Sequence, residues 1–296
     1  MRVAIQLPDG LKVKALEIAK EWMEKGYEVV ISGDSCFGAC DVDFRLLEHA
    51  DMLVHYAHTP IIEDDRIVYV PYPVDYDPHI DFEFAERRLL LAATAQYCHR
   101  LREVKEHLES KGYEVLLRRG DARVKLEGQV LGCNYSALRG EADAVLLISD
   151  GVFHAKGAAL YTGKKVYAYN PLTRELEVVT AENFVRERYV QIARCYGKRK
   201  VGVLLSKKPG QRRETLAFEL AKLARERGFE AFVVSIDDVT TEKLANLPFE
   251  FYVNTACPRV TYDDYRNFSK PIISPQEFRL LLGLDGELKL DEITIV

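Results

Sequence analysis

The chain has 296 residues, a length that allows two or three compact domains because a single hydrophobic core seldom grows that large. Hydrophobic residues make up 48% and charged residues 29%, which is the balance of a globular protein and not of a disordered one. The formal net charge of -5 argues against direct nucleic-acid binding, which needs a basic surface. No apolar run reaches the roughly 18 residues that span a bilayer, so we expect a cytoplasmic protein without a membrane partner.

The first apolar run, at 3–7, predicts a buried strand, and an amphipathic helical stretch follows it. Gly26 stands just past the last periodic residue, where a left-handed helix cap favours glycine, and the run at 29–32 predicts the next strand. The pattern recurs twice, with a helix at 101–110, Gly112 and a strand at 115–117, and then with a strand at 201–205, a helix at 213–227, Gly228 and a strand at 231–234. This alternation is typical of parallel sheets covered by helices.

The repeat predicts an α/β protein of three homologous Rossmann-like domains, each with a parallel sheet, around a pseudo-threefold axis. Helical connectors are expected between the units, near residues 85 and 195. The predicted domains are 1–85, 86–194 and 195–296.

Each predicted domain carries one cysteine that we interpret as lying after the second strand of its unit: Cys40, Cys133 and Cys257. Ligands of open α/β sheets collect at the carboxyl ends of the strands, so three units around one axis can bring these thiols together. Three soft thiolates suit zinc or an iron–sulfur cluster. A [4Fe–4S] cluster held by three thiolates keeps one iron open for a substrate.

The other cysteines need separate interpretations. Six cysteines are too few for a disulfide scaffold in a chain of this length. We expect Cys98 and Cys195 to be packing residues. Cys36 lies four residues before Cys40, but Asp43 occupies the third position of the Cys-x3-Cys-x2-Cys loop of standard radical S-adenosylmethionine enzymes. An exchange of ligands between Cys36 and Cys40 stays open.

Six motifs span almost the whole chain: QLPDGL at 6–11, GDSCFGACDVD at 33–43, LGCNY at 131–135, SDGVFH at 149–154, SKKPGQ at 206–211 and ACPRVTYDDY at 256–265. In these motifs the chain resembles the archaeal diphthamide-synthesis family of 3-amino-3-carboxypropyl transferases. Two positions depart from the family pattern, with Val152 in place of the usual arginine and Cys36 in place of a residue that is typically not cysteine.

This resemblance implies a homodimer that starts diphthamide synthesis on a histidine of translation elongation factor 2. It implies one [4Fe–4S] cluster per subunit, bound at Cys40, Cys133 and Cys257. A reductant protein would reduce the cluster, which then cleaves the bond from sulfur to the γ-carbon of S-adenosylmethionine. The resulting 3-amino-3-carboxypropyl radical adds to the histidine, leaving methylthioadenosine.

Candidate residues for binding S-adenosylmethionine lie in loops at strand ends. Arg259 can pair with the carboxylate, and Asp34 and Asp150 can accept from the amine or the ribose. Turns before predicted helices supply the remaining candidates, Gln6, Gly210 and Gln211.

Several polar segments have less specific interpretations. The basic segment 206–214 can bind an anionic group or an acidic partner, or form a solvated loop. We interpret His55 and His58 as structural or rim residues, and His154 as packing beside Phe153.

Two alternatives to the radical transferase stay open. The same scaffold can serve as a non-catalytic electron-transfer partner or as a zinc-stabilised binding protein. Quinolinate synthase also surrounds an open-iron cluster with three pseudo-threefold domains, but its motifs do not match this sequence.

Overall fold

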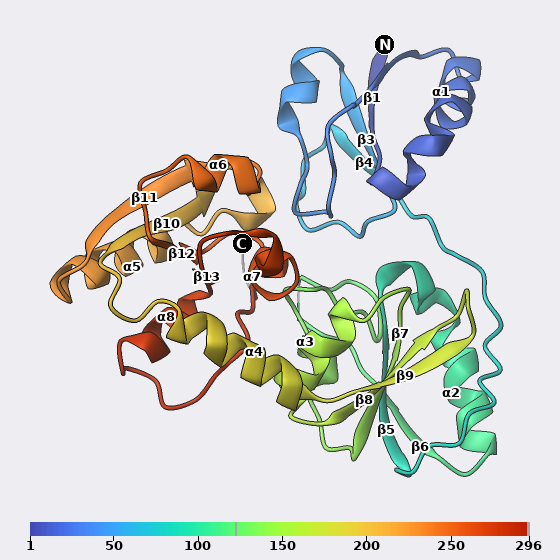
Figure 1. Cartoon of the computed structure of the whole chain (residues 1–296). Helices are drawn as coiled ribbons and strands as arrows, with labels where there is room; N and C mark the ends of the chain where they lie inside the picture. The colour runs from blue at the N-terminus through green and yellow to red at the C-terminus, as the bar shows by residue number, and fades with distance from the viewer. Residues whose placement is uncertain (122, 295–296) are drawn as a thin grey trace.

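The computed structural model describes residues 1–121 and 123–294. They form three sheets, each with its own helices, which appear in Figure 1 as a blue, a green and an orange body. Among these residues, no helix combines the length and apolar character that a bilayer crossing needs.

The first unit is a parallel sheet of order β2-β1-β3-β4, consisting of β1 (Arg2–Gln6), β2 (Glu28–Ile31), β3 (Met52–Tyr56) and β4 (Ile67–Val70). Val3, Ala4 and Ile5 of β1 are fully buried, as the apolar run predicted, and so are Leu53 and Val54 of β3. The helical stretch divides into η1 (Asp9–Lys14) and α1 (Ala15–Glu24), and a short turn, η2 (Phe44–Glu48), precedes β3.

The second unit repeats this order as β6-β5-β7-β8 and adds an antiparallel edge strand, β9 (Glu175–Val179), that the sequence patterns did not predict. Its parallel strands are β5 (Arg88–Ala93), β6 (Glu114–Leu117), β7 (Ala144–Ile148) and β8 (Lys165–Asn170). Its helices are η3 (Ala95–Arg100), α2 (Leu101–Ser110), η4 (Ser136–Leu138) and α3 (Phe153–Thr162).

The third unit has the order β11-β10-β12-β13, with β10 (Lys200–Ser206), β11 (Glu230–Ile236), β12 (Phe251–Asn254) and β13 (Ile272–Ile273). Its helices are η5 (Pro209–Gln211), α5 (Glu214–Glu226), α6 (Thr241–Ala245), α7 (Pro258–Tyr262), η6 (Asp264–Asn267) and α8 (Pro275–Leu281). The same strand order in three sheets confirms the predicted three-unit α/β fold. The domain boundaries themselves stay a prediction.

Glycine ends the first long helix of each unit. Gly26, Gly112 and Gly228 have φ of 88°, 85° and 81°, the left-handed region that the repeat predicted. The chain can then turn sharply from the helix into the second strand of the unit.

The expectation that the cysteines share one position in the repeat is wrong for Cys257. Cys40 and Cys133 lie between the second and third strands of their units, whereas Cys257 follows β12, the third strand. The run 251–254 pairs with β10 as β3 pairs with β1, so it is a sheet strand and not part of a loop after the second strand. The thiols can still converge, because parallel strands end at the same edge of a sheet.

Helix α4 (Ala181–Ala193) joins the second unit to the third (Figure 1). Its Arg188 side chain is fully buried, with Nε 2.6 Å and Nη2 2.8 Å from the two carboxylate oxygens of Glu277. The guanidinium also donates to the carbonyl oxygens of Thr261 and Ile272. Paired and fully hydrogen-bonded, this buried charge fixes α4 against the third sheet.

Candidate functional site

The thiols of Cys40, Cys133 and Cys257 lie close enough for their charges to interact. Burial raises the pKa of Cys40 to about 11, and the neighbouring Cys133 contributes to this shift. Burial, followed by the charges of Cys40 and Cys133, raises the pKa of Cys257 to about 12. Burial also raises the pKa of Cys133. The three units therefore gather their thiols in one place, where a cation would favour the thiolate forms.

The loop that carries Cys40 is fastened to its own sheet by Gln6, at the carboxyl end of β1. The Gln6 side-chain nitrogen donates to the Asp41 carbonyl oxygen at 2.7 Å, and its oxygen accepts from the Asp43 backbone N–H at 3.2 Å. Gln6 is 1% exposed, so these bonds lie in the interior. These two hydrogen bonds fix the position of the Cys40 loop relative to the first sheet.

The third unit approaches the same loop so closely that only glycine fits. A Cβ on Gly210 would lie 2.4 Å from the Cys40 Cα, and the Gly210 N–H donates to the Cys40 carbonyl oxygen at 3.0 Å. Gln211 donates from Nε2 to the Cys40 sulfur at 3.3 Å. Lys208 reaches Asp41 at 2.7 Å. Backbone, thiol and side-chain contacts thus fix Cys40 between two units.

The Cys133 loop is held by a segment from the far end of the chain. The Ile293 N–H donates to the Cys133 carbonyl oxygen at 2.8 Å, and Asn134 donates from Nδ2 to the Ile293 carbonyl oxygen at 3.2 Å. The Tyr135 N–H donates to the Glu292 carboxylate at 3.1 Å. No motif or periodicity of this segment indicated such a role in the sequence.

Cys257 lies directly before α7, and the backbone just ahead of it is held by Arg213. This guanidinium donates to the carbonyl oxygens of Thr255 at 2.7 Å and Ala256 at 3.2 Å. It also forms a bidentate ion pair with Asp291, with both distances at 2.7 Å. One arginine therefore connects the Cys257 segment to the C-terminal segment that holds Cys133.

Arg123 is a buried cation beside the thiols, and no motif of the sequence indicated it. It is 3% exposed, and its Nη2 donates to the Gly210 carbonyl oxygen at 2.8 Å. Its charge opposes the upward pKa shifts of Cys40 and Cys133. Its Nε and Nη1 have no hydrogen-bond partner of normal geometry among the described residues, and the guanidinium faces the Cys133 thiol.

These features fit an iron–sulfur cluster. Buried donors without acceptors cost free energy, and the sulfur atoms of an anionic cluster would accept from them. Gln211 already donates to the Cys40 sulfur, the kind of hydrogen bond that tunes such clusters. The donor set of three thiols and a buried arginine thus suits a cluster bound at Cys40, Cys133 and Cys257.

The predicted cofactor-binding residues are distributed unequally around this centre. Gly210 and Gln211 contact Cys40, while the Gln6 amide is engaged within the first unit. Arg259 is exposed, 3.4 Å from Asp263 and above the Phe153 ring. The remaining candidates, Asp34 and Asp150, are also exposed. Their roles in cofactor binding stay predictions.

Three further cysteine and histidine predictions concern packing. The Cys98 thiol donates to the Thr94 carbonyl oxygen and the Cys195 thiol to the Gln191 carbonyl oxygen, each at 3.4 Å. The His154 ring lies 5.2 Å from the Phe153 ring, between centroids. These contacts agree with packing roles for all three.

His55 and His58 lie at the end of β3 and close to Cys36. His55 Nδ1 is 2.9 Å from the Gln6 side-chain oxygen, and His55 Nε2 is 2.8 Å from His58 Nδ1. Burial lowers the pKa of His55 to about 3 and that of His58 to about 4, so both rings are neutral at physiological pH. The structure thus places His55 in a buried polar group, whereas His58 is half-buried and lines the adjoining cavity, so both interpretations of this pair hold in part.

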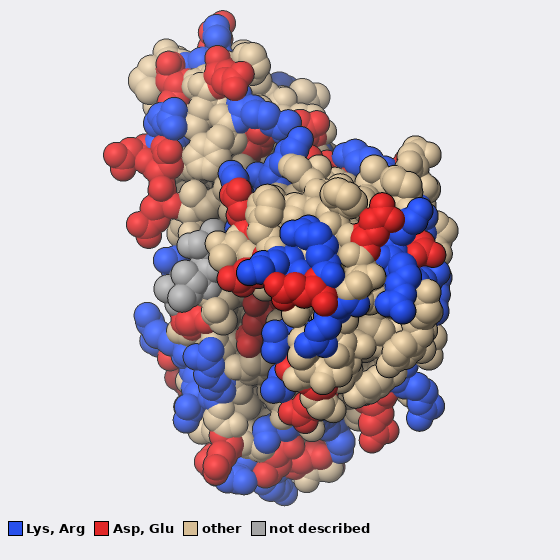
Figure 2. Space-filling view, turned by 90° about the vertical axis from the view of Figure 1, so that its left-hand side faces the viewer, with Lys and Arg blue, Asp and Glu red and all other residues tan. Residues whose placement is uncertain are grey.

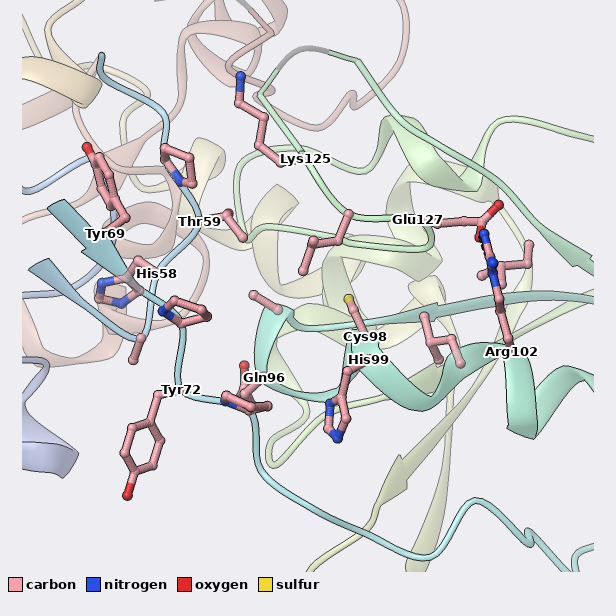
Figure 3. Close-up of a pocket in the computed structure, with 18 residues that line it drawn as sticks. His58, Thr59, Tyr69, Tyr72, Gln96, Cys98, His99, Arg102, Lys125 and Glu127 are labelled. Carbon is pink, nitrogen blue, oxygen red and sulfur yellow. Dashed lines mark hydrogen bonds and ion pairs between the residues drawn. The ribbon is translucent and has the colours of Figure 1, made fainter. Parts of the chain in front are cut away.

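A cavity of about 660 Å³ lies between the first and second units (Figure 3). His58, Tyr69 and Tyr72 line one side, and Gln96 and Arg102 line the other. None of the three converging cysteines lines it.

Most cations of the basic segment 206–214 are neutralised within the protein. Lys208 pairs with Asp41 and Asp238, Arg213 pairs with Asp291, and Arg212 pairs with Glu214. Across the face shown in Figure 2, Lys and Arg are interspersed with Asp and Glu. This face therefore carries charges of both signs side by side.

Fold and site together define the class: a three-unit α/β protein with three cysteines gathered between the units. A family model described as "Putative diphthamide synthesis protein" matches residues 7–293. The chain therefore belongs to the diphthamide synthesis family, as its motifs indicated.

Relatives of known name agree with this assignment. The chain is 40% identical to 2-(3-amino-3-carboxypropyl)histidine synthase of Pyrococcus horikoshii, with 99% of this chain and 89% of the relative covered. The synthase of Methanocaldococcus jannaschii is 28% identical, with 99% and 87% covered. Synthases of this name transfer an aminocarboxypropyl group, which makes the family one of transferases.

Solved structures show the same fold. The crystal structure of Dph2 from Pyrococcus horikoshii matches with a TM-score of 0.92 and 37% identity, covering 99% of this chain and 89% of that one. A second structure of that Dph2, with a 4Fe–4S cluster, matches with a TM-score of 0.91, 37% identity and the same coverage.

Proposed function

We propose that this chain transfers the 3-amino-3-carboxypropyl group of S-adenosylmethionine to a histidine of translation elongation factor 2, the first step of diphthamide synthesis. The observation that carries the proposal is the meeting of Cys40, Cys133 and Cys257 beside the unpartnered donors of Arg123. Membership in the diphthamide synthesis family and the names of the relatives support the substrate.

In this proposal Cys40, Cys133 and Cys257 hold a [4Fe–4S] cluster with one open iron. A bound, reduced cluster supplies the electron that breaks the bond from sulfur to the γ-carbon of S-adenosylmethionine, with methylthioadenosine as the leaving product. The Gln211 and Arg123 donors stabilise negative charge on the sulfur atoms, and the three cysteines are half-buried, so the cluster stays accessible to S-adenosylmethionine.

The loops around this centre bind the remaining parts of S-adenosylmethionine. Arg259 binds the carboxylate of S-adenosylmethionine, because its guanidinium is exposed two residues from Cys257. Asp34 and Asp150 accept from the amine or ribose, and the Gln6 and Gly210 turns shape the pocket. A homodimer that receives its electron from a reductant protein in the cytoplasm completes the proposal.

The test is anaerobic reconstitution with iron and sulfide, followed by reduction in the presence of S-adenosylmethionine and an archaeal elongation factor 2. We expect about four iron per chain, methylthioadenosine release and a mass increase of the elongation factor. Cys40→Ala should lose iron and activity, whereas the matched Cys98→Ala should keep both. One tightly held zinc that Cys40→Ala loses, with no iron and no cofactor cleavage, would instead identify a zinc-stabilised binding protein.

A further inference from the structure

A second group of metal-binding side chains lies outside the three-thiol site. The ligand atoms of Cys36, His55 and His58 all lie within 4.8 Å of one another. Cys36 belongs to the loop after β2, and the histidines lie at the end of β3 and just beyond it. Cys36 is 3% exposed, His55 is fully buried and His58 is half-buried.

The hydrogen bonds of Gln6 determine which His55 nitrogen is free. The Gln6 nitrogen donates to the Asp41 carbonyl oxygen, and the Gln6 oxygen accepts from the Asp43 N–H, so the amide has one orientation. The atom 2.9 Å from His55 Nδ1 is therefore an acceptor, and Nδ1 carries the proton. His55 Nε2 keeps its lone pair and faces His58 Nδ1 at 2.8 Å.

We propose that Cys36, His55 and His58 bind a divalent d-block cation, of which Zn²⁺ suits a set of one thiolate and two neutral imidazoles. The ion takes the place of the proton shared by His55 Nε2 and His58 Nδ1. That proton moves to Nε2 of the same His58 ring, which stays neutral. The Cys36 thiol loses its proton to solvent, so one proton is released for each cation bound.

The geometry needs only small movements to accept the ion. Zinc ligands lie about 2.0–2.3 Å from the metal, so the ligand atoms of a tetrahedral site are roughly 3.3–3.7 Å apart. The three ligand atoms already lie within 4.8 Å of one another, and the 2.8 Å between His55 Nε2 and His58 Nδ1 has to widen by about half an ångström. Gln6 already supports His55 from its other nitrogen, as partners of metal-bound histidines commonly do. His58 lines the cavity of Figure 3, which gives the ion an entry path and a water molecule for the fourth position.

Such an ion would cross-link the loop that carries Cys36 and Cys40 to the sheet of the first unit. Cys36 lies four residues before Cys40, in the same loop, while His55 belongs to β3 and His58 lies two residues beyond its end. The bound cation would limit the motion of the loop that presents Cys40. Cys36 then serves the histidine site and does not substitute for Cys40. The proposal does not depend on which reaction the three-thiol centre performs.

Holoenzyme with its iron–sulfur cluster in place, freed of loosely bound metal, is titrated anaerobically with Co²⁺ and separately with Zn²⁺. We expect one Co²⁺ per chain with tetrahedral d–d bands and a thiolate charge-transfer band, and no change in iron content. Zn²⁺ should displace the Co²⁺ and raise the unfolding temperature. Proton release, measured calorimetrically in buffers of different ionisation enthalpy, should be one per cation.

Cys36→Ser should abolish the charge-transfer band and weaken binding by more than the roughly 10- to 100-fold effect of losing an outer-shell partner. His58→Gln should weaken binding similarly, while the matched Cys98→Ser behaves like the unmodified chain. Unchanged iron content in each variant shows that the fold is intact. The proposal is overturned if the holoenzyme takes up no Co²⁺, or if Cys36→Ser and Cys98→Ser bind it equally. Because iron content and cofactor cleavage are measured separately, neither result bears on the transferase.

Discussion

At the scale of single residues, Ala57 occupies a backbone conformation that its side chain disfavours. Its φ is 67°, in the left-handed region where a Cβ is strained. The position is nonetheless fixed, because the Ala57 N–H donates to the Val70 carbonyl oxygen at 2.8 Å and continues the pairing of β3 with β4. His58, which follows, is thereby directed towards the cavity and Cys36.

Ala57→Gly should stabilise the protein by about 0.5–1 kcal/mol, since relief of strain exceeds the entropy that glycine loses on folding. Chemical unfolding of the cluster-loaded protein measures this difference. The control is Ala193→Gly, at the exposed end of α4, which should destabilise by a similar amount. Destabilisation by both substitutions would contradict the argument from strain.

Arg123 is the second residue considered at this scale, and its effect on the midpoint potential of the cluster can be measured with a single substitution. Arg123→Met removes a buried positive charge beside the thiols, so the reduced, more negative cluster loses stabilisation. We expect a more negative midpoint potential and faster loss of iron, with partial recovery in Arg123→Lys. Arg139→Met, an exposed control, should change neither quantity. Equal midpoint potentials in both methionine variants would show that the Arg123 charge does not act on the cluster.

At the scale of elements, the approach of α3 to the Cys133 loop depends on Gly157. A Cβ at this position would lie 2.0 Å from the Tyr135 hydroxyl oxygen. Tyr135 is fully buried and lies two residues after Cys133, so it has little room to move. The helix can cover the loop only because glycine leaves space for this ring.

Gly157→Ala should therefore destabilise the protein by about 1–3 kcal/mol, although alanine normally favours a helix. Displacement of Tyr135 should also reduce the iron that reconstituted protein retains. Gly151→Ala, where an added Cβ meets no atom within 4 Å, is the matched control and should retain stability and iron. Thermal unfolding and iron analysis of both variants decide the matter, and a stable, iron-replete Gly157→Ala would refute it.

At the scale of the whole molecule, segments distant in sequence assemble the three-thiol centre. The C-terminal residues hold the Cys133 loop, and their Asp291 pairs with Arg213, which also holds the backbone before Cys257. Asp291 is fully buried, so this pair forms away from bulk water. Folding of the third unit and completion of the centre are thereby coupled.

Asp291→Ala should cost about 3–5 kcal/mol, because it leaves the Arg213 charge without its partner in a buried place. The cluster should also be lost more readily, since both cysteine segments are loosened. Glu287→Ala removes an exposed carboxylate of the same C-terminal region, 4.0 Å from Lys289, and should change stability by less than about 0.5 kcal/mol. Urea unfolding of the two variants provides the measurement, and similar midpoints would contradict the coupling.

Much of the fold was predictable, because its determinants are local. Apolar runs at 3–7 and 201–205 and the glycines at 26, 112 and 228 fix strands and helix ends through burial and backbone conformation. The motifs around Cys40 and Cys133 likewise indicated a shared centre. The edge strand β9 was not predicted, since only its last residue, Val179, is buried and its partner β8 is chosen only in the folded sheet.

The sequence by itself determined the three-unit α/β plan, the family and the cysteines that distinguish it. Tertiary structure alone decided that Cys257 follows a third strand, that Arg123 and residues 291–293 surround the thiols, and that Cys36 meets two histidines. The physical reason is range: strand and helix signals act between neighbouring residues, whereas hydrogen bonds and charge pairs join residues whose proximity exists only once three sheets have packed.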